Sequence, residues 1–187
     1  MSPALGAAVL GGVVPYLTLD SPWWRPVNGG PMPLAAEPTG GREIGGAEPG
    51  CQLDDAAGML SEICLQGMAS PVADVFQGLF RLSPLVLRGN IASALAGAAA
   101  RLAGSFPDRA ETVAQLTARM LARQPLRGAG ELVQPDTSQP RRFLIRRSCC
   151  LYYRVPGGGT CGDCVLTPEH VRRQQWKAAL KGSAAAG

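Results

Sequence analysis

The sequence predicts an α+β fold that is predominantly helical, with short N-terminal strands, a central helical layer and a C-terminal cysteine-rich, hairpin-like module. Three observations support this prediction. Apolar residues recur every three or four positions between residues 53 and 121, prolines and glycines bound short segments before residue 37, and four of the six cysteines lie between residues 149 and 164. With 187 residues, 46% of them hydrophobic, the chain can bury a sizeable core. We expect a helical body at 1–140, a C-terminal module at 141–182 and a flexible tail at 183–187.

The N-terminal part is expected to form two short strands or extended segments within residues 12–36, joined by the loop SPWWRPVNGG. Trp23 and Trp24 lie in that loop. Large aromatic side chains there either stack on a ligand or pack the loop onto the core, and we favour packing. Residues 37–50 are rich in glycine, proline and glutamate, and they predict a linker.

The first predicted helix runs from Leu53 to Met68, because its apolar residues recur at helical spacing. This spacing places Cys64 on the buried face. Pro71 is expected to interrupt the helix, since proline lacks the N–H that a helix interior needs. A second short helix is expected over residues 72–82.

Two further helices complete the predicted layer. Ser83 and Pro84 have the pattern of an N-cap followed by a proline in the first turn. Asp108 and Glu111 have the spacing of a capping box at the start of the next helix, which Pro125 ends. The apolar stripes expected on these two helices are Leu87, Ile91, Leu95, Ala98 and Leu102 on the first and Val113, Leu116, Met120 and Leu121 on the second.

The C-terminal part is expected to form a strand, a turn and a last helix. Residues 142–155, RFLIRRSCCLYYRV, are rich in aromatic and branched side chains and predict the strand. The glycines of the following PGGGT predict a turn that brings CGDC back towards the adjacent cysteines. Thr167 and Pro168 cap the last helix, whose expected apolar contacts are Val171, Trp176 and Leu180.

Four cysteines in this region form a ligand set for one soft metal centre. They form an adjacent pair and a CxxC, which are separated by ten residues: Cys149 and Cys150, then Cys161 and Cys164. Such a set implies a reducing compartment, where thiols stay free to bind metal. Cys51 and Cys64 stand apart, and we expect both to be small apolar core residues.

Three chemistries suit four cysteines: an iron-sulfur cluster, structural zinc and a reactive disulfide pair. Adjacent cysteines are a poor zinc knuckle, because neighbouring side chains on an extended chain point to opposite faces. A [2Fe-2S] cluster has two irons, so its ligands need not converge on one point, and we favour it over zinc. A redox disulfide is the weakest interpretation, because the sequence lacks a thioredoxin-like βαβ pattern.

His170 is the single histidine of the chain. A Rieske centre needs two histidines, and a His-dependent hydrolase would have to use this one. We expect His170 to lie on the surface or beside the site rather than to bind metal.

The net charge of +4 is concentrated at the C-terminal end, which has nine arginines and lysines against two acidic residues from Arg141 onward. Positive charge there either offsets the negative charge of four thiolates or simply faces water. The first fifteen residues carry no Lys or Arg to begin a secretory signal, and no apolar run is long enough to cross a bilayer. We expect a cytoplasmic protein with, at most, peripheral membrane association.

The run RRSCCLYYRVPGGGTCGDC resembles the C-terminal cluster motif of the bacterial FhuF-type ferric siderophore reductases. The upstream LVLRGNIASALAGAAARL and the ARQPL loop resemble the helical body of that family, so the resemblance spans roughly residues 10–166. It implies a [2Fe-2S] cluster on the four cysteines and the reduction of ferric siderophore complexes in the cytoplasm. Family members have an N-terminal portion ahead of the region where this chain begins, which implies a short member, a truncated member or a wrongly assigned start.

The leading hypothesis is therefore a ferric siderophore reductase. Cys149 and Cys150 are expected at one end of the cluster and Cys161 and Cys164 at the other. The residues expected beside the ligands are Arg147, Tyr152, Arg154, Gly162 and Asp163, and the candidate substrate contacts are Trp23, Trp24, Arg25 and Asn90.

Two alternatives stay open: a zinc-stabilised binding module with a basic segment, and a siderophore-binding protein with a structural cluster. No recognised nucleic-acid fold frames the basic segment, so we expect no nucleic-acid partner. The type of siderophore, the electron donor and the oligomeric state do not follow from the sequence.

Overall fold

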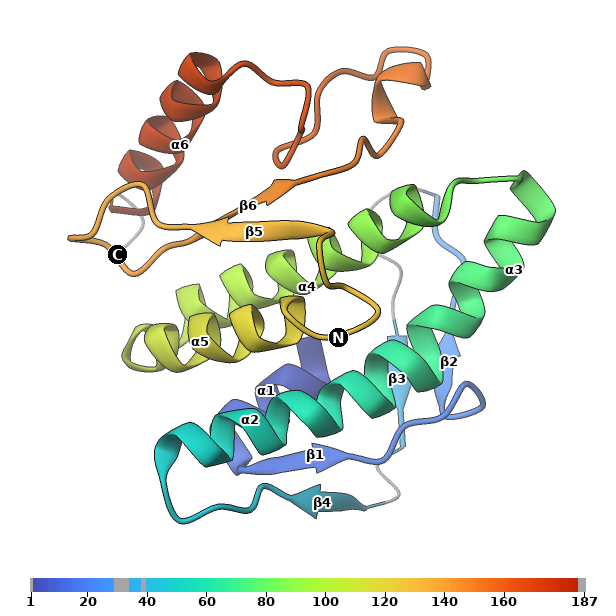
Figure 1. The fold of residues 1–187 in the computed structure, drawn as a ribbon, viewed down its shortest axis with the longest axis vertical. Coiled ribbons are helices and arrows are strands. Elements are labelled where there is room, and N and C mark those ends of the chain that lie inside the picture. The colour runs from blue at the N-terminus through green and yellow to red at the C-terminus, as the bar shows by residue number, and fades with distance from the viewer. Residues whose placement is uncertain (1, 29–33, 38–39, 185–187) are drawn as a thin grey trace.

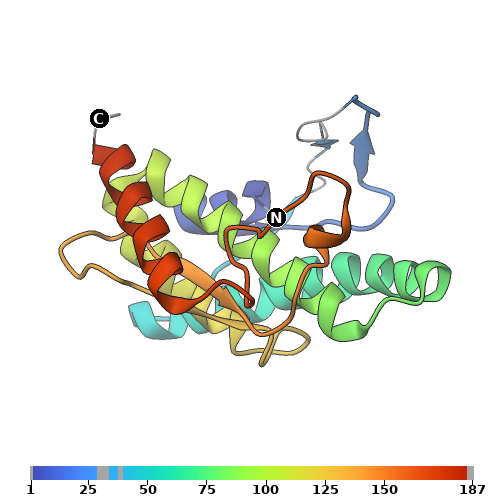
Figure 2. The same ribbon diagram turned by 90° about the horizontal axis from the view of Figure 1, so that it is seen from above.

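The computed structural model describes residues 2–28, 34–37 and 40–184 and confirms a mixed fold of helices with small sheets (Figure 1). The helices form the middle layer. The β1–β4 pair lies on one side of them and the β5–β6 pair on the other, with the cysteine-bearing segment and α6 outermost (Figures 1 and 2). The helices of the described part are α1 (Ser2–Gly11), α2 (Pro49–Leu60), α3 (Ser70–Phe80), α4 (Pro84–Ser105), α5 (Ala110–Leu121) and α6 (Glu169–Ala184).

The strands form antiparallel pairs of three or four residues. These pairs are β1 (Val13–Pro15) with β4 (Gly41–Glu43), β2 (Pro22–Trp24) with β3 (Leu34–Ala36), and β5 (Gly130–Val133) with β6 (Phe143–Arg146). The prediction of a linker over residues 37–50 is wrong for the middle of this range, where β4 pairs with β1. A Cβ at Gly41 would lie 2.4 Å from a methyl group of Val13, so the close pairing of these strands requires glycine.

Pro71 does not interrupt the helix that contains Cys64, which corrects the sequence prediction. A π-helical stretch, η1 (Ser61–Ala69), joins α2 to α3 without a break. The N–H of Ser70 bonds to the carbonyl of Leu65, five residues back, so the wider turn ends where the proline begins α3. Proline is tolerated in a first turn. The second predicted helix is therefore present, as a continuation of the first.

The start of α4 is as predicted and the start of α5 is not. The N–H of Leu85 donates to the Ser83 hydroxyl at 3.3 Å, which confirms Ser83 as the N-cap of α4. Before α5 a 3-10 turn, η2 (Pro107–Arg109), contains Asp108, and no side chain caps the helix. Glu111 instead binds Arg142 of the C-terminal part at 3.0 Å.

The core lies between α1, α2, η1, α4 and α5. Its largest fully buried side chains are Leu5, Val14, Leu60, Leu65, Leu95, Val113, Leu116, Met120, Leu126 and Leu144. Cys64 is buried among them, as predicted. Cys51 is exposed on the first turn of α2, so its assignment to the core is wrong.

The last helix, α6, packs back on β6 through aromatic side chains. The rings of Phe143 and Trp176 stack with centroids 5.4 Å apart, and Trp176 and Leu180 are buried. This confirms two of the three predicted contacts of the helix, with Val171 half-buried. The predicted tail, 183–187, begins inside α6, and residues 185–187 lie outside the described part.

Candidate metal centre

The strand that leads to the cysteines is shorter than the sequence predicts. β6 ends at Arg146, because β5 offers only four partner residues, and the chain from Ser148 to Leu151 is irregular. Leu151 takes a left-handed backbone conformation with φ of 65°, and the 3-10 turn η3 (Tyr152–Arg154) follows. The expected strand through residue 155 is therefore wrong, and the described structure shows no cysteine-rich hairpin there.

Backbone amides fold over the adjacent cysteine pair. The N–H of Leu151 donates to Sγ of Cys149 at 3.3 Å, and the N–H of Tyr152 donates to Sγ of Cys150 at 3.4 Å. The left-handed conformation of Leu151 makes this geometry possible. N–H groups directed at sulfur are a common feature around thiolate-bound metals, where they tune the reduction potential.

The loop of residues 151–160 returns the chain so that the two halves of the motif meet. Sγ of Cys150 lies 3.4 Å from Sγ of Cys161. The loop can follow this path only with glycine at position 158, because a Cβ there would lie 2.2 Å from the carbonyl oxygen of Tyr152. In the described part of the chain, no three His, Cys, Asp or Glu side chains gather closely enough to hold a single ion. The structure thus brings together one sulfur pair of the four predicted ligands.

The two close thiols differ in acidity. Partial burial raises the pKa of Cys150, but the Tyr152 N–H, the bond to Cys161 and the charge of Arg146 outweigh it and lower the pKa below 9.0. Burial, together with the bond to Cys150, raises the pKa of Cys161 to about 11. The backbone N–H and the nearby guanidinium thus favour the thiolate form at Cys150, whereas burial disfavours it at Cys161.

Arg146 is the buried cation of the site, and the sequence analysis did not single it out. Its side chain is 2% exposed, and its guanidinium donates to the carbonyls of Ser148 at 3.1 Å and Val86 at 3.4 Å. Arg147, the residue chosen from the sequence, is exposed and lies 3.7 Å from Glu131. The alternation of side chains along a strand could have identified Arg146 as buried. It places Leu144 and Arg146 on one face of the strand and Arg147 on the other.

Helix α4 holds the cysteine-bearing segment at three points. The Ser148 hydroxyl donates to the carbonyl of Leu85 at 2.7 Å, Arg146 reaches Val86, and the Ser93 hydroxyl donates to the Asp163 carboxylate. Gly89 allows the close approach, because a Cβ there would lie 2.3 Å from the Ser148 hydroxyl and 2.6 Å from the Arg146 guanidinium. Asp163 is thus tied to the helix that supports the site.

The other residues expected beside the ligands are placed as follows. Tyr152 and Gly162 are exposed, and nothing lies within 4 Å of a Cβ built on Gly162. Arg154 is exposed and turns to Tyr153, with its Nε 3.1 Å from the Tyr153 hydroxyl. His170 is exposed on α6. Their roles at the site stay predictions.

One segment of the chain, which contains the clustered cysteines, matches a known protein family. Residues 146–166 match the family model of the FhuF 2Fe-2S C-terminal domain. The match begins at Arg146 and contains all four clustered cysteines, and it confirms the resemblance over this segment. No curated protein and no solved structure matches the chain. Residues 146–166 are called the FhuF-type segment below.

A pocket of about 360 Å³ borders the FhuF-type segment at Cys161. Thr160, Cys161, Gly162 and Asp163 form one wall. The remaining lining comes from α4, from the start of β6 and from α6, with Ala96, Gly97, Ala100, Arg141, Arg142, Phe143, Leu144, Gln175, Trp176 and Ala179. A small molecule in this pocket would lie against the residues around one ligand of the predicted cluster.

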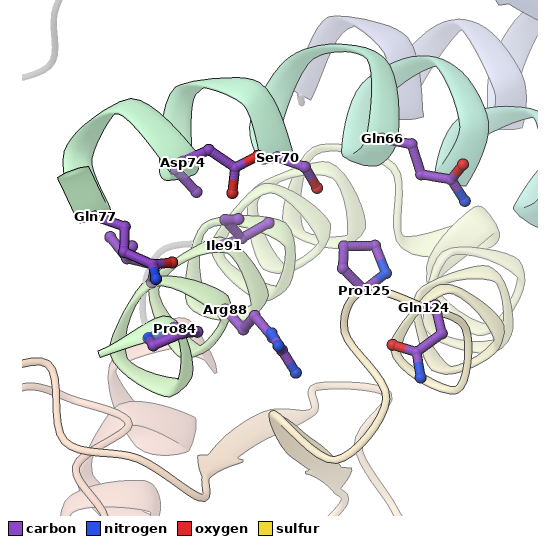
Figure 3. Close-up of a pocket in the computed structure, with 11 residues that line it drawn as sticks. Gln66, Ser70, Asp74, Gln77, Pro84, Arg88, Ile91, Gln124 and Pro125 are labelled. Carbon is purple, nitrogen blue, oxygen red and sulfur yellow. The ribbon is translucent and has the colours of Figure 1, made fainter. Parts of the chain in front are cut away.

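A second pocket, of about 330 Å³, lies between α3 and α4 (Figure 3). Gln66, Ser70, Asp74 and Gln77 line it from the η1–α3 helix, and Arg88 lines it from α4. The α4 residues of this pocket are Pro84, Leu87, Arg88 and Ile91, whereas Leu85, Gly89, Ser93 and Ala96 of the same helix face the FhuF-type segment or its pocket. At 100° per residue these sets lie on opposite faces of the helix, so the second pocket is separated from the cysteines by α4.

None of the four candidate substrate contacts lines either pocket. Trp23 and Trp24 belong to β2 and are 71% and 63% exposed, so the expectation that they pack a loop onto the core is wrong. Arg25 and Asn90 are also exposed. The described part contains no helix of the length and apolar character needed to cross a membrane.

Proposed function

We propose that this protein holds a [2Fe-2S] cluster on Cys149, Cys150, Cys161 and Cys164 and reduces ferric siderophore complexes by one electron. The observation that carries the proposal is the match of residues 146–166 to the FhuF 2Fe-2S C-terminal domain, with all four cysteines inside it. A reducing, cytoplasmic setting and an electron donor of still unassigned identity belong to the same proposal.

The residues fit such a centre in donor chemistry and in surroundings. Four thiols are soft donors, two of them lie 3.4 Å apart, and two backbone N–H groups already point at sulfur. When bound, the cluster would supply single electrons without any proton-transferring side chain.

The chain's own residues would fix and tune the site. Arg146 places a buried positive charge beside Cys150, which opposes the negative charge of the thiolates and favours the more reduced state. Helix α4 holds the segment at Leu85, Val86 and Ser93 and keeps the ligands in place. Cys149, Cys150 and Cys161 are half-buried residues, which would permit close approach of an acceptor.

The pocket beside Cys161 is the place where we propose that a ferric chelate, or part of one, approaches. Siderophore oxygens are hard ligands that hold ferric iron strongly and ferrous iron weakly, so one electron is enough to loosen the metal. Arg141 and Arg142 border the pocket and would attract the oxygen-rich surface of such a chelate.

The test is to purify the protein without oxygen and to assay iron, sulfide and zinc together with visible absorption and low-temperature EPR after reduction. We expect two irons and two sulfides per chain and an EPR signal of a reduced [2Fe-2S] cluster. A ferric hydroxamate and a ferric catecholate should each be tried as oxidants, and at least one should reoxidise the reduced protein faster than buffer does. A colourless protein with stoichiometric zinc would contradict the proposal.

A further inference from the structure

We propose that each iron of the cluster is bound by one cysteine from each half of the motif: Cys150 and Cys161 bind one iron, and Cys149 and Cys164 bind the other. This inference rests on the proposed function, because it concerns the same cluster. It replaces the pairing expected from the sequence, in which Cys149 and Cys150 share one iron.

The distance between Cys150 and Cys161 carries the inference. Thiolate sulfurs that bind one tetrahedral metal at about 2.3 Å lie about 3.8 Å from each other. The sulfurs of Cys150 and Cys161 are 3.4 Å apart, so a small outward shift makes them ligands of the same iron. Ligands on different irons are farther apart, because the bridging sulfides stand between the two metals. Cys150 and Cys161 are therefore placed for one iron and not for two.

Two different backbone N–H groups bind the two sulfurs of the adjacent pair. Each of its sulfurs accepts a hydrogen bond from the N–H two residues later, Leu151 for Cys149 and Tyr152 for Cys150. The two sulfurs thus lie over successive peptide groups. The 3.4 Å contact joins one sulfur of this pair, that of Cys150, to Cys161 of the other half of the motif.

The two cysteines of the CxxC half differ in burial. The N–H of Cys164 donates to the carbonyl of Cys161 at 3.1 Å, which closes a turn between them. Cys164 is 5% exposed, whereas Cys161 is half-buried, so the two side chains leave the turn at different depths. With Cys150 and Cys161 on one iron, Cys164 is left to share the second iron with Cys149.

This pairing makes the cluster a bridge between the two halves of the FhuF-type segment. Each iron would connect the stretch after β6 to the stretch before α6 across the loop of residues 151–160. Neither half of the motif would hold an iron with its own two cysteines.

The pairing can be read from iron spectroscopy of two double variants, C150S/C161S and C149S/C150S. Both are loaded with ⁵⁷Fe, and the oxidised cluster is examined by Mössbauer spectroscopy. We expect C150S/C161S to change one of two equal quadrupole doublets and to leave the other at its wild-type parameters, because both serine oxygens bind one iron. We expect C149S/C150S to change both doublets. The reverse result would overturn the inference, and so would a change of both doublets in both variants.

A second measurement does not depend on cluster assembly in the variants. Phenylarsine oxide, whose arsenic binds two thiolates at once, is added in equal amount to the reduced, cluster-free wild-type protein, and the bridged peptides are mapped by mass spectrometry. We expect the first bridge between Cys150 and Cys161. A bridge between Cys149 and Cys150, or between Cys161 and Cys164, would overturn the pairing. Failure of the proposed function looks different, since it gives a wild-type protein that holds zinc or no cluster at all.

Discussion

The helical body and the FhuF-type segment are held together in different ways. The body buries large apolar side chains such as Leu60, Leu95 and Leu116 to within 1% of complete burial. In the segment the large apolar side chains stay in water, with Tyr152 and Tyr153 each 49% exposed and Leu166 58% exposed. Burial of a large apolar side chain contributes about 1.5–3 kcal/mol, so the body has a driving force for folding that the segment lacks.

The segment therefore depends on its anchors to α4, and we expect it to depend also on the cluster proposed for it. Its described anchors to α4 are the hydrogen bonds of Arg146, Ser148 and Asp163. A typical net contribution of one hydrogen bond is about 1 kcal/mol, so three of them position the segment without making it rigid. Metal binding would supply the remaining order, as it does in small metal-bound modules.

The largest expected effect comes from removal of a ligand, which separates the two regions. We expect Cys161→Ala to lower iron and sulfide content by about tenfold or more and to leave the far-UV circular dichroism nearly unchanged, because the helical core lies outside the segment. Cys51→Ala is the matched control, since Cys51 is an exposed cysteine of the body. Equal loss of iron in both variants, or loss of helicity in Cys161→Ala, would show that the two regions are not separable in this way.

The next largest effect tests the close approach of α4 to the segment. Gly89→Ala places a methyl group 2.3 Å from the Ser148 hydroxyl and 2.6 Å from the Arg146 guanidinium. We expect a loss of about 1–3 kcal/mol in the free energy of unfolding, measured with urea, together with lower cluster content.

Gly104→Ala is the control for this substitution. Gly104 lies in the same helix, and nothing is within 4 Å of its Cβ position. Because alanine favours a helix over glycine, the control should be neutral or more stable by up to about 1 kcal/mol. The contact between α4 and the segment would be unimportant if the two variants behaved alike.

Substitution of two neighbouring arginines tests how charge near the cysteines affects the midpoint potential of the proposed cluster. Removing the buried charge in Arg146→Gln should lower the midpoint potential, because a reduced cluster carries one more negative charge. A close charge pair at an effective dielectric constant of about 20 is worth a few kcal/mol, which corresponds to a shift on the order of 100 mV. Arg147→Gln removes an exposed charge, and its shift should be several-fold smaller. Redox titration followed by EPR measures both, and Arg146→Lys should restore much of the shift. Equal shifts at the two positions would assign no special role to the buried arginine.

The sequence predicted the body well where local rules decide the structure. Ser83 caps α4 as expected, and Val113, Leu116, Met120 and Leu121 form the buried stripe of α5, because capping and periodicity depend on neighbours along the chain. Pro71 was misjudged, because a π-helical stretch moves the hydrogen-bond pattern by one residue before it.

The four cysteines could be proposed from the sequence and lie within the matched segment, but their arrangement could not be predicted. Spacing singled out the four cysteines, whereas the end of β6 depends on β5, a strand that was not predicted from the sequence. The burial of Arg146 depends on Gly89, more than fifty residues away in the sequence, which no local pattern reveals. Trp23 and Trp24 were expected to pack inward, yet they lie on a short strand pair at the surface.

The smallest expected effect concerns the ion pair that joins the body to the strand before the cysteines. The side-chain bond from Gln115, together with Arg142 at 3.0 Å, lowers the pKa of Glu111 below its ordinary value. Because the folded-state pKa is depressed, this contribution to stability is present above the unfolded pKa and is lost as the pH falls through the folded value. Glu111 is 58% exposed, so Glu111→Gln should cost only about 0.3–0.5 kcal/mol in urea unfolding at pH 7, and nothing at pH 3. Glu131→Gln, at the longer 3.7 Å pair with Arg147, is the control and should cost less at pH 7. If Glu111→Gln lowers the free energy of unfolding at pH 3 as much as at pH 7, the Glu111 side chain stabilises the fold by packing and not by its charge.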